Sequence, residues 1–157
     1  MSGRIFQLSA SGGGVPKLPV REVRIGRLGL EGDVQKHTKI HGGPDRAVCL
    51  YALEVICALQ AEGHPVYPGA LGDNVTVAGL DWPRIGAGTQ LALGDEVVLE
   101  VTRHTEPCKQ IAASFHDGGF RRIDQDRHPG WSRVYARVLR EGRVRVGQPV
   151  ASYLPTV

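Results

Sequence analysis

Cys108 has the sequence context of a reactive or metal-binding cysteine. It lies in the segment Thr105-Glu106-Pro107-Cys108-Lys109, after a predicted strand and at the start of a predicted short helix. A helix N-terminus and a neighbouring lysine both lower the pKa of a thiol, and the thiolate is the form that binds metals and attacks electrophiles. Most free cysteines are instead buried and inert, so position alone leaves both interpretations open.

A glycine-rich basic segment is the second concentration of chemical groups. Its histidines have HxxxH spacing, which binds zinc on a helix, but the adjacent glycines and proline argue against a helix here. Gly42-Gly43 allows close backbone approach to an anion, which favours an oxyanion site, with a solvated charged loop as an equal alternative. The cationic residues are Lys36, His37, Lys39, His41 and Arg46.

The remaining cysteines, Cys49 and Cys57, lie in an apolar run and on the apolar face of a predicted helix, so both are predicted to be buried. An odd number of cysteines without a CxxC motif favours reduced thiols. The N-terminal residues lack an apolar signal core, and no segment approaches the ~20 apolar residues of a membrane span. We therefore expect a cytoplasmic protein without a membrane partner.

The elements that must position these residues are predicted to be mostly strands. The 21 glycines and 10 prolines are too many for a helical bundle and suit a turn-rich β domain. Strands separated by turns, with two short helices, predict a mainly β, barrel-like fold. The predicted strands are Ile5–Ala10, Pro19–Ile25, Arg46–Tyr51, Asn74–Val77, Thr89–Leu93, Glu96–His104, Ser132–Arg140, Arg143–Val146 and Val150–Leu154, and the helices are Leu53–Ala61 and Pro107–Phe115.

Charge is distributed unevenly along the chain. Residues 47–102 carry one basic and seven acidic side chains, a net of −6, whereas residues 103–145 carry ten basic and five acidic side chains, a net of +5. Arginine supplies 15 of the 19 basic residues, and its planar fork suits phosphate. An anionic ligand is therefore favoured, with an ordinary solvated surface as the alternative. Aromatic residues make up only 6% of the chain, so a nucleic-acid partner is not expected.

An ordered set of motifs resembles the MOSC domain, the C-terminal domain of molybdenum cofactor sulfurases. Each motif alone is weak, but the set extends from about Gly26 to Val150 in the family's order and includes its Pro-Cys pair. The motifs are Gly29-Leu30-Glu31-Gly32-Asp33, His41-Gly42-Gly43-Pro44-Asp45-Arg46-Ala47-Val48-Cys49-Leu50-Tyr51, Pro68-Gly69-Ala70-Leu71-Gly72-Asp73-Asn74-Val75-Thr76-Val77-Ala78-Gly79-Leu80, Ile85-Gly86, Leu93-Gly94, Glu106-Pro107-Cys108, and Gly130-Trp131 with Arg137-Val138-Leu139.

The resemblance implies a single MOSC domain over residues 1–157, with a β-barrel-like fold and a few short helices. It also implies a pocket for the molybdenum cofactor (molybdopterin), in which Cys108 ligates molybdenum or carries sulfur as a persulfide. Relatives reduce N-hydroxylated bases and amidoximes, so the implied activity is an oxidoreductase with a small-molecule substrate. The implied cofactor contacts are Lys36, His37, His41, Arg46, Asn74 and Arg133, and His37, His104 and His128 are candidate proton donors.

The chain departs from the family pattern at two places. Gly72-Asp73-Asn74 stands where Gly-Glu-Asn is usual, and Trp131-Ser132 replaces an aromatic pair. The sequence has no Cys₄ spacing for an iron–sulfur cluster and no aminotransferase-like segment. An external electron donor or sulfurase protein is therefore the expected partner, and no pyridoxal phosphate site is expected. The alternatives are a non-catalytic sulfur or cofactor carrier, and an anion-binding β-barrel without redox chemistry.

Overall fold

The computed structural model of the protein describes residues 2–34 and 43–155. Strands dominate it, and the helical segments are short. The elements are β1 (Ser2–Ala10), β2 (Leu18–Val20), β3 (Glu22–Gly26), β4 (Gly29–Leu30), η1 (Pro44–Arg46), β5 (Val48–Ala52), α2 (Leu53–Ala61), β6 (Val75–Ala78), η2 (Trp82–Arg84), β7 (Gln90–Leu93), β8 (Val97–His104), η3 (Lys109–Ser114), η4 (Phe120–Ile123), β9 (Val134–Arg140), β10 (Gly142–Arg145) and β11 (Pro149–Tyr153), where η marks a 3₁₀-helix.

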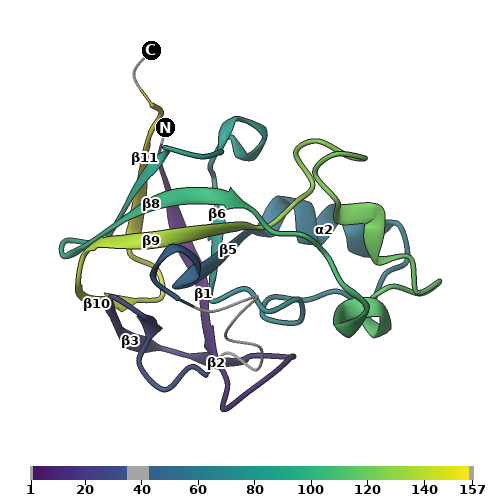
Figure 1. The fold of residues 1–157 in the computed structure, drawn as a ribbon, viewed down its shortest axis with the longest axis horizontal. Helices are drawn as coiled ribbons and strands as arrows, with labels where there is room; N and C mark the ends of the chain where they lie inside the picture. The colour runs from purple at the N-terminus through teal and green to yellow at the C-terminus, as the bar shows by residue number, and fades with distance from the viewer. Residues whose placement is uncertain (1, 35–42, 156–157) are drawn as a thin grey trace.

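Seven strands close into a barrel in the order β11-β7-β8-β9-β5-β6-β1, and β1 pairs with β11 to complete it (Figure 1). Neighbouring strands are antiparallel except β5 and β6, which are parallel. A parallel pair requires a crossover connection, which α2 and the loop after it supply. On β8 the alternating residues Val97, Leu99 and Val101 are buried. The mainly β, barrel-like fold predicted from the sequence is therefore confirmed.

A smaller sheet, in the order β10-β3-β4, lies beside the barrel. Its presence shows that one predicted strand is in fact two. We predicted a single strand over Pro19–Ile25, but the chain divides at Arg21 into β2, which pairs with β1, and β3, which pairs with β10. The carbonyl of Arg21 accepts a hydrogen bond from the Val146 amide at 2.9 Å. A strand that changes sheets at one residue leaves no mark on the alternating pattern of its two halves.

The helix α2 buries a narrower face than the sequence suggests. Ile56 and Leu59 are fully buried, but Cys57 is exposed, so the prediction that Cys57 lies in the core is wrong. Residues three apart share a helix face, whereas the residue after Ile56 points about 100° away from it. The barrel therefore covers one narrow stripe of α2 and leaves the Cys57 thiol in solvent.

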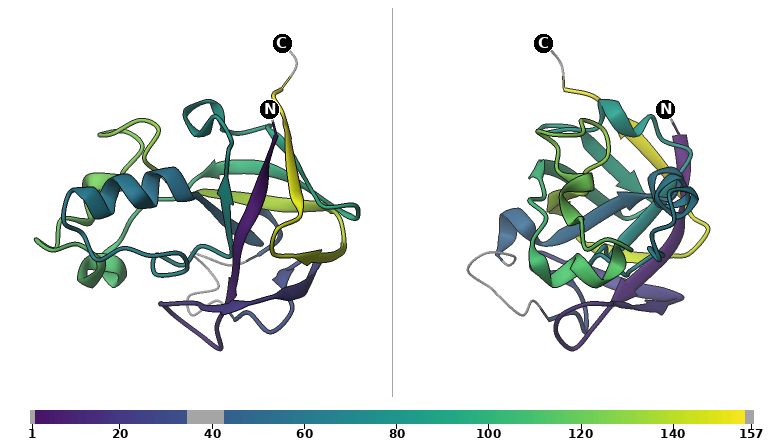
Figure 2. Two further views of the ribbon diagram at one scale, coloured as in Figure 1. Left: turned by 180° about the vertical axis from the view of Figure 1, so that it is seen from behind. Right: turned by 90° about the vertical axis from the view of Figure 1, so that its right-hand side faces the viewer.

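The Pro107–Phe115 segment forms the 3₁₀-helix η3, and Cys108 is the residue directly before it. The helices α2, η3 and η4 gather at one end of the barrel, as two opposite views agree (Figures 1 and 2). Within the described ranges, no helix has the length and apolar character of a transmembrane span.

The exposure of Cys57 can be tested by comparing two neighbouring substitutions on α2. Ile56→Ala removes a fully buried side chain and should lower the free energy of unfolding by about 2–5 kcal/mol. Cys57→Ala removes an exposed thiol and should change it by less than about 0.5 kcal/mol. Urea unfolding followed by circular dichroism measures both, and a comparable loss in Cys57→Ala would show that this side of α2 is covered.

Candidate functional site

One pocket, which we call the thiol pocket, brings two cysteines and two basic side chains together. Its volume is about 60 Å³, which is room for roughly four to six water molecules at ~10–15 Å³ each. Its walls come from the β1–β2 loop, β5, the loop before β6, the segment around η3 and the start of β9. The residues that line it are Gly14, Val15, Lys17, Val34, Cys49, Leu71, Gly72, Glu106, Cys108, Gln110, Ile111, Arg133 and Tyr135.

Cys108 is positioned by the turn that joins β8 to η3. Its backbone is extended (φ −137°, ψ 171°), and its carbonyl accepts the Ile111 amide at 3.2 Å as η3 begins. The side chain is partly accessible and faces the pocket. The predicted location of Cys108 at a helix start therefore agrees with the structure, although the helix is a short 3₁₀-helix.

Cys49 provides a second thiol with a different environment. It lies on β5 and is buried, and burial raises the pKa of its thiol to about 11 despite the opposing charge of Arg133. Cys49 is consequently protonated near neutral pH, when it is a poor nucleophile and metal ligand. Of the two pocket thiols, Cys108 is thus the one suited to chemistry.

Arg133 holds a hydrogen-bond donor that the described residues do not satisfy. The residue is only 6% exposed, lines the pocket, and donates from Nη1 to the Leu71 carbonyl. Its Nε–H is buried and has no acceptor among the described residues. Because buried donors are nearly always satisfied, an oxyanion in the pocket is a natural acceptor for this group.

Lys17, the other basic side chain among the described lining residues, is already neutralised. Its Nζ lies 2.6 Å from Asp33 Oδ2, and both side chains are almost completely buried. The same Asp33 oxygen accepts from Asn74 Nδ2 at 3.0 Å, and Asp33 Oδ1 accepts the Ser11 amide at 3.0 Å. Lys17 therefore acts with Asp33 as a structural ion pair, and Arg133 is left to face a ligand.

Asn74 lies behind the pocket and is not one of its lining residues. It is fully buried; its Oδ1 accepts the Cys49 amide at 2.9 Å, and its Nδ2 also donates to the Ser9 carbonyl at 3.2 Å. These bonds fix β5, β1 and the Lys17–Asp33 pair relative to one another. In the structure, this predicted cofactor contact supports the pocket wall.

Asp73, which stands where the family usually has Glu, stabilises the loop before β6. Its Oδ1 accepts the Gly69 amide at 3.0 Å, and its Oδ2 accepts from Thr76 Oγ1 at 2.6 Å. Burial raises the pKa of the Asp73 carboxyl, which the hydrogen bonds from Thr76 and Gly69 oppose. The shorter acid in Gly72-Asp73-Asn74 thus reaches its partners and stabilises the turn before β6.

The other predicted site residues either do not line the pocket or lie outside the described ranges. Arg46 is half-buried in η1, with its guanidinium carbon 5.8 Å from the centre of the Tyr135 ring, and Tyr135 lines the pocket. His104 and His128 are half-buried and are not lining residues; burial lowers the pKa of His104. Lys36, His37 and His41 lie outside the described residues.

Sequence reasoning did not identify Lys17, Cys49 or Tyr135 as pocket residues. Lys17 closely follows the glycines that begin at Gly12. Because loops often carry binding residues, this glycine-rich loop was the signal that could have identified Lys17. Cys49 and Tyr135 sit in apolar strands, where nothing in the pattern separates a residue lining a pocket from one in the core.

Comparisons with known proteins agree with this architecture. The MOSC domain family model matches residues 37–151. YflK of Bacillus subtilis is 36% identical over 136 residues, which cover 85% of this chain and 60% of YflK. YiiM of Escherichia coli is 30% identical over 134 residues, covering 82% and 58%, and a Gibberella moniliformis protein named "Reductase" is 29% identical over 116 residues, covering 71% and 20%. The chain thus spans about 60% of the length of its bacterial relatives.

Solved structures share the fold. A crystal structure described as an hypothetical protein superposes with a TM-score of 0.77 at 26% identity, covering all of this chain and 70% of that one. The crystal structure of YiiM from Escherichia coli gives a TM-score of 0.74 at 23% identity, over 99% of this chain and 71% of that one. The MOSC family is associated with molybdenum cofactor binding. The match over residues 37–151, on a barrel that carries the pocket described above, establishes that the chain belongs to the MOSC domain family.

Proposed function

We propose that the thiol pocket binds the molybdenum cofactor and that the protein reduces N-hydroxylated small molecules there. The observation that carries this proposal is the pairing of the Cys108 thiol with the buried Nε–H of Arg133, which has no acceptor among the described residues. A thiolate suits a soft metal centre, and a guanidinium N–H suits an oxyanion. This donor set fits a cofactor that combines a sulfur-ligated metal with an anionic pterin.

Each residue has a definite task in this proposal. Cys108 Sγ is the molybdenum ligand, and Arg133 Nε donates to an anionic oxygen. Asn74 acts through its bonds to Asp33 and the Cys49 amide, which keep the wall in place. At about 60 Å³ the pocket accommodates the reacting end of the ligand, so the remainder lies outside it. The outer contacts proposed are Lys36, His37, His41 and Arg46.

When bound, the cofactor would supply two electrons from an external donor protein to an N–O bond, so that a hydroxylamine and two protons give an amine and water. Protons are assigned to His37, His104 or His128, which are the candidates by residue type. Burial lowers the pKa of His104, which favours its neutral form near neutral pH, so this histidine would donate only after taking up a proton.

A persulfide carrier is the second candidate function. The observation that favours it is the small volume of the pocket, which has room for one added sulfur on Cys108 without any rearrangement. In that case Cys108 would carry sulfur delivered by a sulfurase protein and would turn over no substrate. An added mass of about 32 Da on Cys108, with no bound molybdenum, would favour this function.

Substitution of Cys108 tests the proposed ligand. Protein from a host that makes the cofactor should contain stoichiometric molybdenum and reduce hydroxylaminopurine with a flavin donor. Cys108→Ser replaces a soft thiolate with a hard hydroxyl and should lower the reduction rate by orders of magnitude while preserving the fold. Elemental analysis and the reductase assay measure both, with Cys57→Ser as the matched thiol control. Parental activity in Cys108→Ser would rule out Cys108 as the ligand.

Removal of an outer cation should weaken cofactor retention. Loss of one charge-assisted hydrogen bond costs about 1.5–3 kcal/mol, or about 10- to 150-fold in affinity. His41→Ala and Arg46→Ala should each lose molybdenum on dialysis, whereas Arg84→Ala, at an exposed position that does not line the pocket, should not. Full retention in both variants would mean that the basic segment is a solvated loop.

The three thiols should differ in alkylation, and the cofactor should protect only one. Without cofactor, Cys57 and Cys108 should react with iodoacetamide, whereas Cys49 should react only after unfolding because it is buried and protonated. Cofactor binding should slow alkylation of Cys108 and leave that of Cys57 unchanged. Timed peptide mapping measures the three rates, and equal protection of Cys57 would contradict a site at Cys108.

A further inference from the structure

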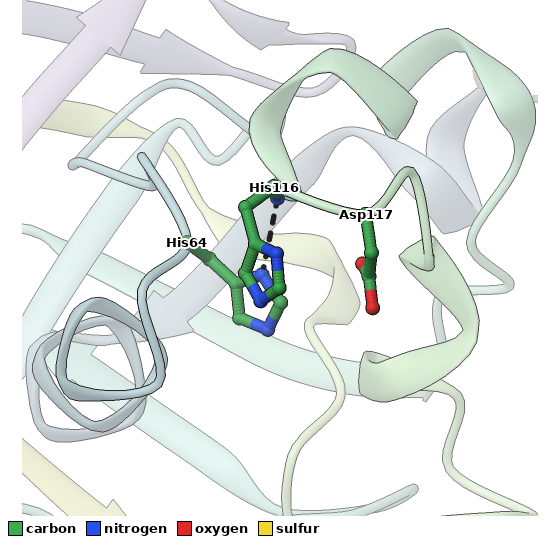
Figure 3. A group of neighbouring side chains, drawn as sticks. All are labelled: His64, His116 and Asp117. Carbon is green, nitrogen blue, oxygen red and sulfur yellow. Dashed lines mark hydrogen bonds between the residues drawn. The ribbon is translucent and has the colours of Figure 1, made fainter.

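Two histidines and an aspartate form a cluster at the helical end of the barrel, and none of the three lines the thiol pocket. His64 follows α2, and His116 and Asp117 follow η3 (Figure 3). One possible ligand atom from each residue lies within 4.8 Å of the other two. His64 is buried, whereas His116 and Asp117 are exposed. Two imidazoles and a carboxylate are a donor set that suits zinc and similar divalent ions.

Gly63 places His64 in this position. Its φ of 94° lies in the left-handed region, where α2 ends, and the His64 amide then donates to the Leu59 carbonyl at 3.1 Å. A Cβ on Gly63 would come within 3.5 Å of the His116 ring. The helix end therefore turns His64 inward against His116, and the two rings stack with centroids 4.6 Å apart.

The contacts of His64 select the tautomer that a metal needs. Its Nδ1 accepts the His116 amide at a long 3.3 Å, so Nδ1 carries the lone pair. A neutral imidazole whose Nδ1 is an acceptor carries its proton on Nε2, and this nitrogen lies 3.6 Å from Glu62 Oε1. The Nδ1 lone pair thus points toward the backbone amide of His116, next to Asp117 in the chain.

Glu62 is itself held in place as an outer partner. Arg122 binds its two carboxylate oxygens at 2.8 and 2.9 Å, and this contact lowers the pKa of Glu62. An ionised carboxylate behind the distal N–H of a histidine is the arrangement that orients metal-bound imidazoles in proteins. The Arg122 charge is balanced by Glu62, which leaves Asp117 as the carboxylate available to a cation. The Gly119 amide, donating to Asp117, lowers the pKa of that carboxyl.

We propose that His64 Nδ1, His116 and Asp117 form a binding site for Zn²⁺ or a related first-row divalent ion. The ion would replace the long His116 amide bond to His64, and water would complete its coordination. Tetrahedral zinc ligands lie about 3.4 Å apart, so the three atoms must draw closer. The exposed side chains of His116 and Asp117 can rotate to do so, and the ring stacking is given up.

Such an ion would link the end of α2 to the segment that carries Cys108. His116 is the second residue after the end of η3, and Cys108 directly precedes η3. The site is independent of the proposed reductase function, because none of its three ligands lines the thiol pocket.

Zinc titration of the full chain tests the proposal. Cys57→Ser and Cys108→Ser are introduced into every sample so that thiols do not compete. Calorimetry with ZnCl₂ should show one site whose affinity falls at least tenfold in His116→Ala and in Asp117→Asn. Both residues are exposed, so these variants should remain folded. Glu62→Gln should weaken binding by about 10- to 100-fold through the outer contact.

The matched control is His128→Ala, a half-buried histidine outside the cluster, which should bind zinc like the parent. The double variant with His37→Ala and His41→Ala should also bind zinc normally. Unchanged zinc affinity in His116→Ala and Asp117→Asn would overturn the proposal. Loss of zinc binding in the His37→Ala/His41→Ala double variant would also overturn it. In the protein with all three cysteines, zinc-edge absorption should show nitrogen and oxygen ligands near ~2.0–2.1 Å, and sulfur near ~2.3 Å would assign the ion to a thiol instead.

Discussion

The buried ion pair between Lys17 and Asp33 is the interaction on which the pocket wall depends. Two charges withdrawn from water are stable only if they are paired and their remaining hydrogen-bonding capacity is used. Asp33 meets this requirement by accepting from Lys17, Asn74 and the Ser11 amide together. Because Asn74 also binds the Cys49 amide, the charge pair fixes the β1–β2 loop and the segment after β4 against β5.

The same requirement explains why Lys17 and Arg133, the basic residues among the described lining residues, have different roles. Lys17 lies against a carboxylate, so its charge is neutralised and it can be buried without a ligand. Arg133 lies against a carbonyl, which satisfies one of its donors, and its buried Nε–H has no acceptor among the described residues. A guanidinium can direct its N–H donors at different partners because they project from a rigid plane, whereas the donors of a lysine all belong to one ammonium group. Arg133 is therefore the residue to which we assign the proposed anion contact.

The sequence predicted the barrel because strand alternation is a local signal. Val97, Leu99 and Val101 alternate inward on β8 whatever their partners are. The division of Pro19–Ile25 at Arg21 and the exposure of Cys57 depend on which neighbour covers each face, which the local pattern does not carry. For the site, the pocket location of Cys108 and Arg133 was predicted, but the support role of Asn74 was not. An amide satisfied by backbone groups far away in sequence looks the same, in sequence, as one facing a ligand.

The segment between Cys108 and His116 shows why the helical end of the barrel matters to the pocket. A 3₁₀-helix as short as η3 has strained hydrogen bonds and little stability of its own, so its position depends on how its ends are held. At one end, the Thr105 amide donates to the Arg133 carbonyl at 3.0 Å, beside the pocket. At the other end, the His116 amide reaches His64 at 3.3 Å, and the His64 ring packs edge-on against Phe115 at 5.0 Å. The second anchor has the longer hydrogen bond, and Cys108 lies between the two anchors, nearer to the Thr105 contact. The segment that carries Cys108 is therefore held beside the pocket at one end and by the His64 cluster at the other.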